Sequence, residues 1–356
     1  MRYAALAVFA GVLAFASAPR SAWADPDVPS EVTPAIRASA AKAIKWLVAA
    51  QNPNGSWGLE PGTQDDIGGT CVATLCLMGN GSTSTRGPHA AQVAKAIAWV
   101  MRTSAQHNHS LPRSTTSLIS RKLGNEIEGF LATLLLAEAL GTETNREQQE
   151  QIRKAVATMV GVISAQQRED GSWNSQVFAP LLATASAWMS LRTAYMAGIP
   201  AGSASVQKTL DYVKRQLDPK TGVFHGVSRE EDYRFYGQAC GLRVLFGMGL
   251  GEDALTQKGV QALFTHKYKP YDHQFISEGE NYMAAWYSTQ SLFQDPSPGR
   301  ALYFRWYKEI AATLLGCQDA DGSWRGTACI TSRVFSTSCA VLTLQVPLRT
   351  LPMTEY

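Results

Sequence analysis

The chain contains the stretch Gln51-Asn52-Pro53-Asn54-Gly55-Ser56-Trp57, and the pattern of this stretch returns twice. The later copies run from Gln167 to Trp173 and from Gln318 to Trp324, with Gln, Gly, Ser and Trp at the same spacing. Repetition of a fixed pattern is typical of proteins built from stacked structural repeats. The sequence therefore predicts a repeat architecture.

Each residue type of the pattern has a structural role at a helix end. The glycine adopts a positive φ just past the last helical turn and so ends the helix. The tryptophan covers the junction with a large apolar ring, and the glutamine is placed to bond exposed backbone groups. We therefore interpret the following residues as structural staples between helical hairpins: Gln51, Gly55, Trp57, Gln167, Gly171, Trp173, Gln318, Gly322 and Trp324.

Between the copies, segments with helical periodicity alternate between two kinds. In the first pair, Ile36, Ala40 and Leu47 share one face with charged residues opposite, whereas the run from Thr70 to Met78 carries no charge. The first helix of such a pair faces water and its partner is enclosed. About six pairs of this kind follow one another, at roughly fifty residues each.

Closure of this array into a ring buries every apolar face. An open array exposes the faces of its end repeats and needs polar caps there, and the sequence shows none. We therefore predict an all-α fold, an (α/α)6 toroid with amphipathic helices outside, apolar helices inside and a central cavity.

The first residues have the features of a secretory signal peptide. Arg2 precedes an apolar stretch, and Ala22-Trp23-Ala24 fits a small-x-small cleavage site. We expect residues 1–24 to be removed on export, residues 25–356 to form a single toroid domain, and the mature protein to be periplasmic or extracellular. No later stretch is long and uncharged enough to span a membrane.

Charge and cysteine usage narrow the partners. The net charge of +3 falls to +1 without Arg2 and Arg20, so no nucleic-acid partner is expected. The six cysteines form no C-x-x-C pair and the six histidines are scattered, so we expect neither a metal site nor a cofactor. The disulfide pattern and the oligomeric state stay open.

The Gln-x3-Gly-x-Trp motif followed by an apolar helix resembles the repeat of squalene-hopene cyclases and protein prenyltransferase β subunits. The stretch from Asp66 to Leu75 is similar to the entry of that family's inner helix. The resemblance covers nearly the whole mature chain and implies the α/α toroid of the terpenoid cyclase and prenyltransferase superfamily. A shared fold does not by itself give the function.

The catalytic patterns of these families are incomplete. Triterpene cyclases use the middle Asp of Asp-x-Asp-Asp as an acid, and Thr63-Gln64-Asp65-Asp66 lacks the first carboxylate. Protein prenyltransferases bind zinc through a Cys and a His in two stretches that this chain resembles. Tyr233 and Met283 occupy those two positions here, so the zinc ligands are missing. A secreted pectate lyase family shares the toroid, and its chemistry requires an Arg base and carboxylates that bind calcium.

The loops that enter the inner helices should gather at one mouth of the cavity. A carboxylate there is also explained by helix capping, but the loops together mix acids, arginines and tyrosines. The candidates for catalysis are Asp65, Asp66, Glu231, Asp232, Arg234, His273 and Glu280. The candidates for ligand binding are Tyr233, Tyr236, Tyr282, Arg333 and Glu126, and the same loops also hold Arg121, Asn125, Glu128 and Glu278.

Three functions remain open, and the sequence does not decide whether the protein is an enzyme. The first is a toroid that binds, or also acts on, an isoprenoid or other elongated ligand in its cavity, which a deep aromatic tunnel would favour. The second is a pectate lyase-like enzyme, which an open groove with an arginine facing paired carboxylates would favour. The third is a non-catalytic interaction platform, which a centre filled by side chains would favour.

Overall fold

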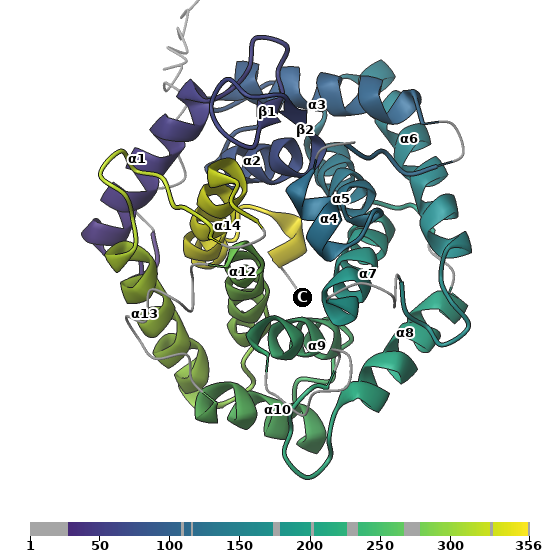
Figure 1. Cartoon of the computed structure of the whole chain (residues 1–356), viewed down its shortest axis with the longest axis vertical. Helices are drawn as coiled ribbons and strands as arrows, with labels where there is room; N and C mark the ends of the chain where they lie inside the picture. The colour runs from purple at the N-terminus through teal and green to yellow at the C-terminus, as the bar shows by residue number, and fades with distance from the viewer. Residues whose placement is uncertain are drawn as a thin grey trace, which may run out of the picture.

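The structure is a computed structural model, and it describes residues 28–107, 110–114, 117–173, 179–200, 203–225, 234–266, 278–327 and 330–354. Two concentric rings of helices make up the molecule (Figure 1). The predicted signal peptide and four predicted site residues, Glu231, Asp232, Tyr233 and His273, lie outside the described residues.

Amphipathic helices form the outer ring and helices buried on nearly every side form the inner ring, as predicted. The outer helices are α1 (Pro34–Ala49), α3 (Ala90–Ala105), α6 (Arg146–Ala165), α8 (Ser203–Gln216), α10 (Ala254–Thr265) and α13 (Ala301–Gly316). The inner helices are α2 (Ile67–Gly79), α5 (Ile127–Thr142), α7 (Pro180–Met196), α9 (Phe235–Gly247), α12 (Gly279–Phe293) and α14 (Arg333–Gln345).

The ring is closed, which confirms the toroid. Each inner helix packs against the next, and the last one, α14, packs against the first, α2. The outer helix α13 likewise contacts α1. Short elements complete the fold: strands β1 (Trp57–Gly58) and β2 (Asp65–Asp66), helix α4 (Leu118–Leu123), and the 3-10 turns η2 (Pro298–Arg300), η3 (Val346–Leu348) and η4 (Pro352–Thr354).

The glutamines of the repeated motif join neighbouring hairpins. The Gln51 side-chain amide donates to the Gln92 carbonyl of α3 at 3.0 Å and to the carbonyl of its own motif glycine at 3.0 Å. The Gln318 amide makes the same two bonds, but its second partner is the Ser39 carbonyl of α1 at 3.0 Å. The third copy of the motif therefore seals the ring between the last hairpin and the first.

The glycines and tryptophans of the motif explain why its composition is fixed. Gly171 has φ +88°, and a Cβ added there would lie 2.0 Å from the Lys208 carbonyl oxygen of α8. Only glycine permits this close approach. The three motif tryptophans are buried, and each indole N–H donates to a carbonyl near the end of the preceding outer helix, at 2.7–2.8 Å. These contacts support the structural role predicted for the motif.

A fourth staple has no counterpart in the sequence pattern. Gly222 has φ +75°, and a Cβ there would lie 2.4 Å from the Lys258 carbonyl oxygen of α10. Phe224 takes the place of the tryptophan, and its N–H donates to Gln238 Oε1 at 3.2 Å. Gln238 Nε2 donates to the carbonyls of Gly222 and Gly259 at 2.9 and 2.7 Å. The bridging glutamine here comes from an inner helix.

The end of the chain covers one end of the inner ring, and Figure 1 shows the C-terminus within that ring. The Met353 N–H donates to Glu138 Oε1 at 2.8 Å, and Arg243 Nη2 donates to the Met353 carbonyl at 3.3 Å. Glu138 and Arg243 belong to the C-terminal halves of α5 and α9. The tail therefore closes the end at which the inner helices finish.

Candidate functional site

The inner helices all begin at the same end of the ring. The Gly68 N–H at the start of α2 donates to Glu128 at the start of α5. In the same way, Gln345 in the last turn of α14 donates to the Cys76 carbonyl in the last turn of α2. The described candidates Asp66, Glu126, Arg234, Glu280 and Arg333 each stand at the start of an inner helix, so they surround one mouth. The tail covers the opposite end.

Where α2 and α5 begin, the mouth contains a buried pair of carboxyl groups, Asp66 and Glu128. Asp66 caps α2 by accepting a 2.5 Å hydrogen bond from the Gly69 N–H, and its Oδ2 has no hydrogen-bond partner among the described residues. Glu128 is fully buried and accepts from the Gly68 N–H, from the Ser114 N–H and Oγ, and from Ser120 Oγ, at 2.6–3.2 Å. Such a set of donors stabilises a carboxylate.

Burial sets the Asp66 carboxyl group apart from an ordinary aspartate. Burial, and then the neighbouring charge of Glu128, raise the pKa of Asp66 from 3.8 to about 7. A strongly raised pKa in a buried carboxyl group is one mark of a candidate functional site. Asp66 is thus a carboxylic acid able to carry a proton at neutral pH. The serines that hold Glu128 were not predicted, because nothing in their local sequence marks them.

Two predicted residues of the mouth serve the outer loops instead. Asp65 accepts from Asn52 Nδ2 at 3.1 Å, from Asn54 Nδ2 at 2.8 Å and from the Ser56 hydroxyl, so it braces the first motif loop. The Arg333 guanidinium bonds to the Asp321 carboxylate and lies 5.0 Å from the centre of an outer-helix ring, that of Trp46. The side chains of Asp65 and Arg333 therefore bond to the motif loops, whereas the side chain of Asp66 caps α2.

An ion pair crosses the mouth. Lys122 Nζ lies 3.3 Å from Glu280 Oε1, and the side chain of Glu280 is only 1% exposed. Lys122 belongs to α4, which packs against α5 and α7, whereas Glu280 begins α12. Figure 1 shows α4 inside the outer ring, beside α5 and α7. Helix α4 therefore covers part of the mouth and is tied to α12 by one buried salt bridge.

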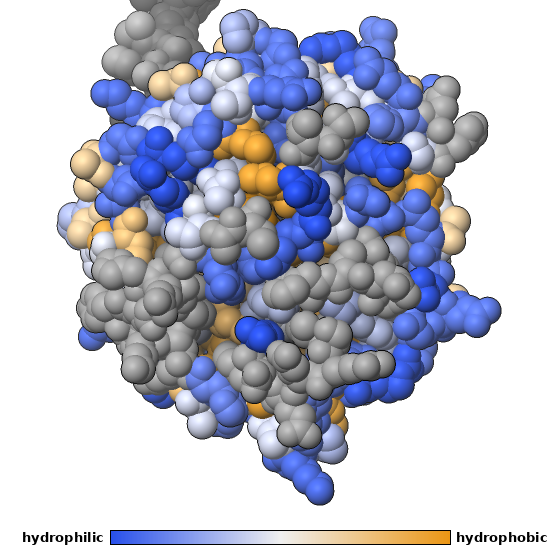
Figure 2. Space-filling model, viewed as in Figure 1, coloured by the Kyte–Doolittle hydropathy of each residue, from blue (hydrophilic) through white to orange (hydrophobic). Residues whose placement is uncertain are grey.

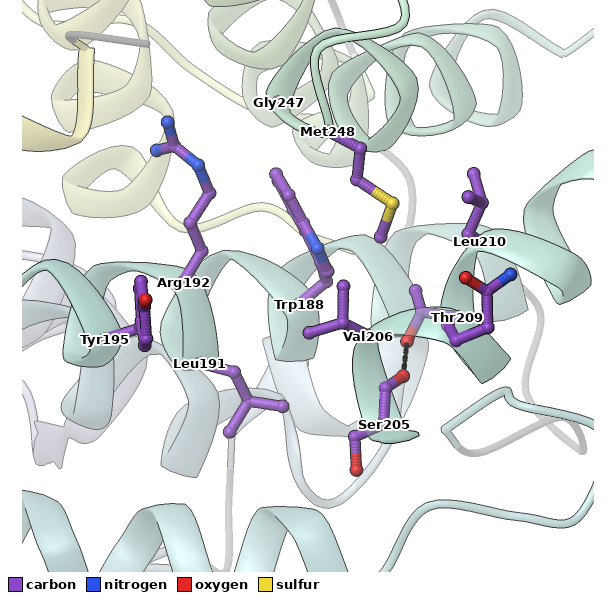
Figure 3. A pocket seen from close by; sticks show the side chains of 11 residues that line it. Trp188, Leu191, Arg192, Tyr195, Ser205, Val206, Thr209, Leu210, Gly247 and Met248 are labelled. Carbon is purple, nitrogen blue, oxygen red and sulfur yellow. Dashed lines mark hydrogen bonds between the residues drawn. The ribbon is translucent and has the colours of Figure 1, made fainter. Parts of the chain in front are cut away.

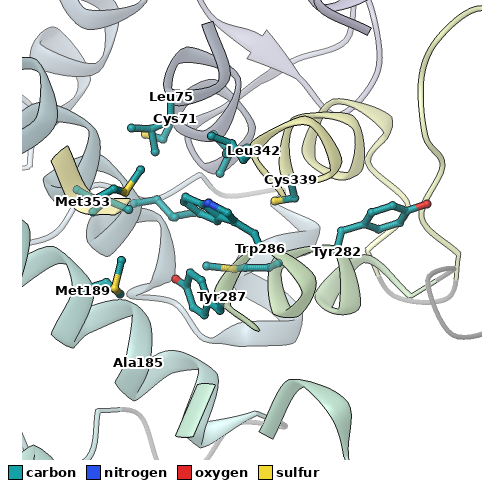
Figure 4. Close-up of a cluster of buried hydrophobic side chains, with 14 of the residues drawn as sticks. Cys71, Leu75, Ala185, Met189, Tyr282, Trp286, Tyr287, Cys339, Leu342 and Met353 are labelled. Atoms are coloured by element: carbon teal, nitrogen blue, oxygen red, sulfur yellow. The ribbon is translucent and has the colours of Figure 1, made fainter. Parts of the chain in front are cut away.

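Aromatic and sulfur-containing side chains fill the interior deeper in the ring. Trp286, Tyr287 and Met189 pack with Met353 of the tail and are fully buried (Figure 4). Tyr282 points away from this cluster, and its hydroxyl donates to the Arg325 carbonyl at 3.4 Å. The part of the interior next to the tail is therefore a packed core.

The other predicted site residues, the catalytic candidate Arg234 among them, are spread around the mouth. Tyr236 is buried in the first turn of α9, while Arg234 and Glu126 precede α9 and α5 without capping them through their side chains. The described residues contain no group of three or more His, Cys, Asp or Glu side chains placed to hold a metal ion. No helix in the described part of the chain is long and apolar enough to cross a membrane. Hydrophilic residues dominate the visible coloured surface of the face in Figure 2.

The chain is similar to a known protein family and, at low identity, to solved structures. The profile of the prenyltransferase alpha-alpha toroid domain matches residues 31–117 and 130–273. No curated protein matches the chain. Among solved structures, the type II terpene cyclase MstE from Scytonema with geranylgeranyl dihydroxybenzoate as substrate is 14% identical, with 90% of this chain and 99% of that chain covered and a TM-score of 0.36. The same cyclase with merosterolic acid A as product is 15% identical, with 91% and 99% covered and a TM-score of 0.37.

Proposed function

Because the chain belongs to the prenyltransferase alpha-alpha toroid family, we propose that it binds an isoprenoid or similarly elongated apolar molecule within its inner ring. The observation that carries the proposal is Asp66, a buried carboxylic acid with an unpartnered oxygen beside the apolar interior. In the proposed protein, residues 1–24 direct export and residues 25–356 form one toroid domain.

The proposed ligand occupies the half of the interior next to the mouth. The half next to the tail is packed by Trp286, Tyr287 and Met353, so the proposal places the ligand chain between the mouth and that cluster. Apolar side chains of α2, α5 and α12 supply its surroundings. Helix α4 covers part of the mouth, and in this proposal the bridge between Lys122 and Glu280 opens when the ligand enters.

Asp66 is the group that gives this site chemical capacity. Its raised pKa of about 7 leaves a large protonated fraction at neutral pH. Transfer of that proton to one alkene carbon of the ligand would leave a carbocation on the neighbouring carbon and an Asp66 carboxylate that keeps its bond to the Gly69 N–H. The cation is discharged when a carbon next to it gives a proton back to that carboxylate, so the step moves the double bond and restores the acid. In this proposal Asp66 takes the part of the acid, and Asp65, the position matching the cyclase pattern, keeps its loop role.

Native mass spectrometry with geranylgeraniol, squalene and an oligogalacturonate tests the proposal. We expect one geranylgeraniol or squalene per chain and no oligogalacturonate. Asp66→Asn keeps the helix cap and the volume, so it should retain binding while it abolishes any conversion of the ligand. Binding of the oligogalacturonate alone would overturn the proposal and favour polysaccharide cleavage.

A second function is supported by the packed interior. Trp286, Tyr287 and Met353 have no exposed surface, and the tail closes the ring behind them. A filled ring is a rigid disc suited to hold partners on its outer surface. If none of the three ligands binds, the protein acts as a non-catalytic interaction platform.

A further inference from the structure

A groove lies between the inner helices α7 and α9 and the outer helix α8, towards the C-terminal ends of α7 and α9 and away from the mouth. Trp188, Leu191, Val206, Leu210 and Met248 line a cavity of about 530 Å³ there (Figure 3). Pockets of roughly 300–1,000 Å³ with mainly apolar walls are the usual size for small organic ligands. Val206 is 40% exposed, so the groove is open to solvent.

A second cavity next to the groove has a different character. This cavity, of about 580 Å³, shares Arg192 and Gly247 with the groove and is also lined by Arg300 and Arg349. Three arginines thus converge here from α7, from the turn before α13 and from the segment after η3. We call this second cavity the bay. An apolar groove next to a bay lined by arginines suits an amphiphile with an acidic head group.

The backbone of the bay is unusual. Among the described residues, Arg300 and Arg349 are the non-glycine residues with positive φ, at +54° and +53°, and both line this cavity. Side-chain-bearing residues rarely adopt this conformation, and such strain concentrates at ligand-binding sites. Arg300 adopts it directly before α13 and Arg349 directly after η3, so these two turns bring both arginines to the same cavity.

Three arginines line the bay together with one acidic residue, Asp295, so arginines outnumber acids there. The Asp295 oxygens accept from the Ser297 N–H and Oγ and from the Leu302 and Tyr303 N–H groups, at 2.7–3.2 Å, which fixes this carboxylate against the start of α13. Burial raises the pKa of Glu138 to about 8, while the charge of Arg192 acts to lower it. Arg192 Nη1 has no hydrogen-bond partner among the described residues.

We propose that this groove and bay bind an anionic amphiphile with a single chain, whose chain lies along Trp188, Val206 and Met248 and whose carboxylate or phosphate head contacts Arg192. The bonds from an arginine to either head are charge-assisted and can be bidentate. The site lies outside the inner ring, so it is independent of the isoprenoid site proposed above.

The test uses palmitate, hexadecyl phosphate and the neutral hexadecanol as probes on the full chain. Binding is followed by tryptophan fluorescence, because Trp188 lines the groove, and stoichiometry by native mass spectrometry. We expect one palmitate or hexadecyl phosphate per chain and at least about tenfold weaker binding of hexadecanol, because loss of a charged partner weakens such contacts. The tighter of the two anionic probes identifies the head group as carboxylate or phosphate.

Variants separate the two halves of the site. Arg192→Gln should weaken the binding of both anions about tenfold or more, and Arg192→Lys should restore much of it. Val206→Asp places a charge at an exposed position of the groove, so it should abolish binding without unfolding the chain. Arg146→Gln, an exposed arginine at the start of α6, is the matched control and should leave binding unchanged.

Equal affinity for hexadecanol and palmitate would overturn the proposal, as would an unchanged affinity in folded Val206→Asp or Arg192→Gln. Absence of binding by both anionic probes would overturn it as well.

Discussion

Replacement of Gln318 by alanine tests ring closure at the seam between the last hairpin and the first. The Gln318 amide donates to the Ser39 and Gly322 carbonyls at 3.0 and 2.9 Å, and its oxygen accepts from the Ser39 hydroxyl at 2.8 Å. A net 0.5–1.5 kcal/mol for each bond gives a loss of about 2–4 kcal/mol. With an unfolding entropy near 2.1 cal/mol/K per residue, this corresponds to a fall in Tm of roughly 3–6 °C.

Differential scanning fluorimetry of three variants measures the effect. Gln51→Ala removes the two equivalent donated bonds at a seam between consecutive hairpins, and Gln106→Ala removes an exposed glutamine at the end of α3. A closed ring predicts that Gln318→Ala and Gln51→Ala lower Tm by similar amounts while Gln106→Ala has little effect. If Gln318→Ala behaves like Gln106→Ala while Gln51→Ala is destabilised, the two ends of the chain do not meet and the ring is wrong.

Three further predictions concern the staples, the buried acids and the mouth. Trp173→Ala should lower the free energy of unfolding by about 3–5 kcal/mol, since it empties a fully buried site, and an unchanged Tm would contradict the staple role. The pKa of Asp66 is raised from 3.8 to about 7 on folding, so the folded protein binds this proton more tightly than the unfolded chain does. The free energy of unfolding of the wild type therefore falls as the pH rises from about 4 to 7. Asp66→Asn should therefore gain stability relative to the wild type over that range, by at most about 4 kcal/mol in denaturant titrations, and a constant difference between pH 4 and 8 would refute the raised pKa. Glu280→Gln removes the charge that ties α4 to α12, so geranylgeraniol should bind faster in stopped-flow fluorescence, and an unchanged association rate would show that α4 does not limit entry.

The fold could be predicted because its signals are local and repeated. Gly171 and Trp173 act within a few residues of a helix end, and their spacing to Gln167 is visible in the chain. The charge-free stretch of α2 likewise marks an inner helix without any knowledge of its neighbours. Ring closure followed from the absence of an exposed apolar face, which is a property of the whole pattern.

The site could be predicted only in part, because its contacts join residues far apart in the sequence. Asp66 was a candidate, but its pairing with Glu128 depends on two helix starts that meet in space. Gln238 stands 16 residues after the glycine it bonds, so the fourth staple breaks the repeated spacing. The return of Met353 to Glu138 spans 215 residues and carries no sequence signal.

The position of a bound isoprenoid tests the central claim most directly. A geranylgeraniol analogue with a photoreactive diazirine, activated in complex with the protein and located by peptide mass spectrometry, reports which helices surround it. The proposal predicts labels on the N-terminal halves of α2, α5 and α12, suppressed by excess unlabelled geranylgeraniol. Labels confined to the outer groove of α7 and α8, or labels that excess geranylgeraniol does not suppress, would contradict the claim that the ring holds the ligand.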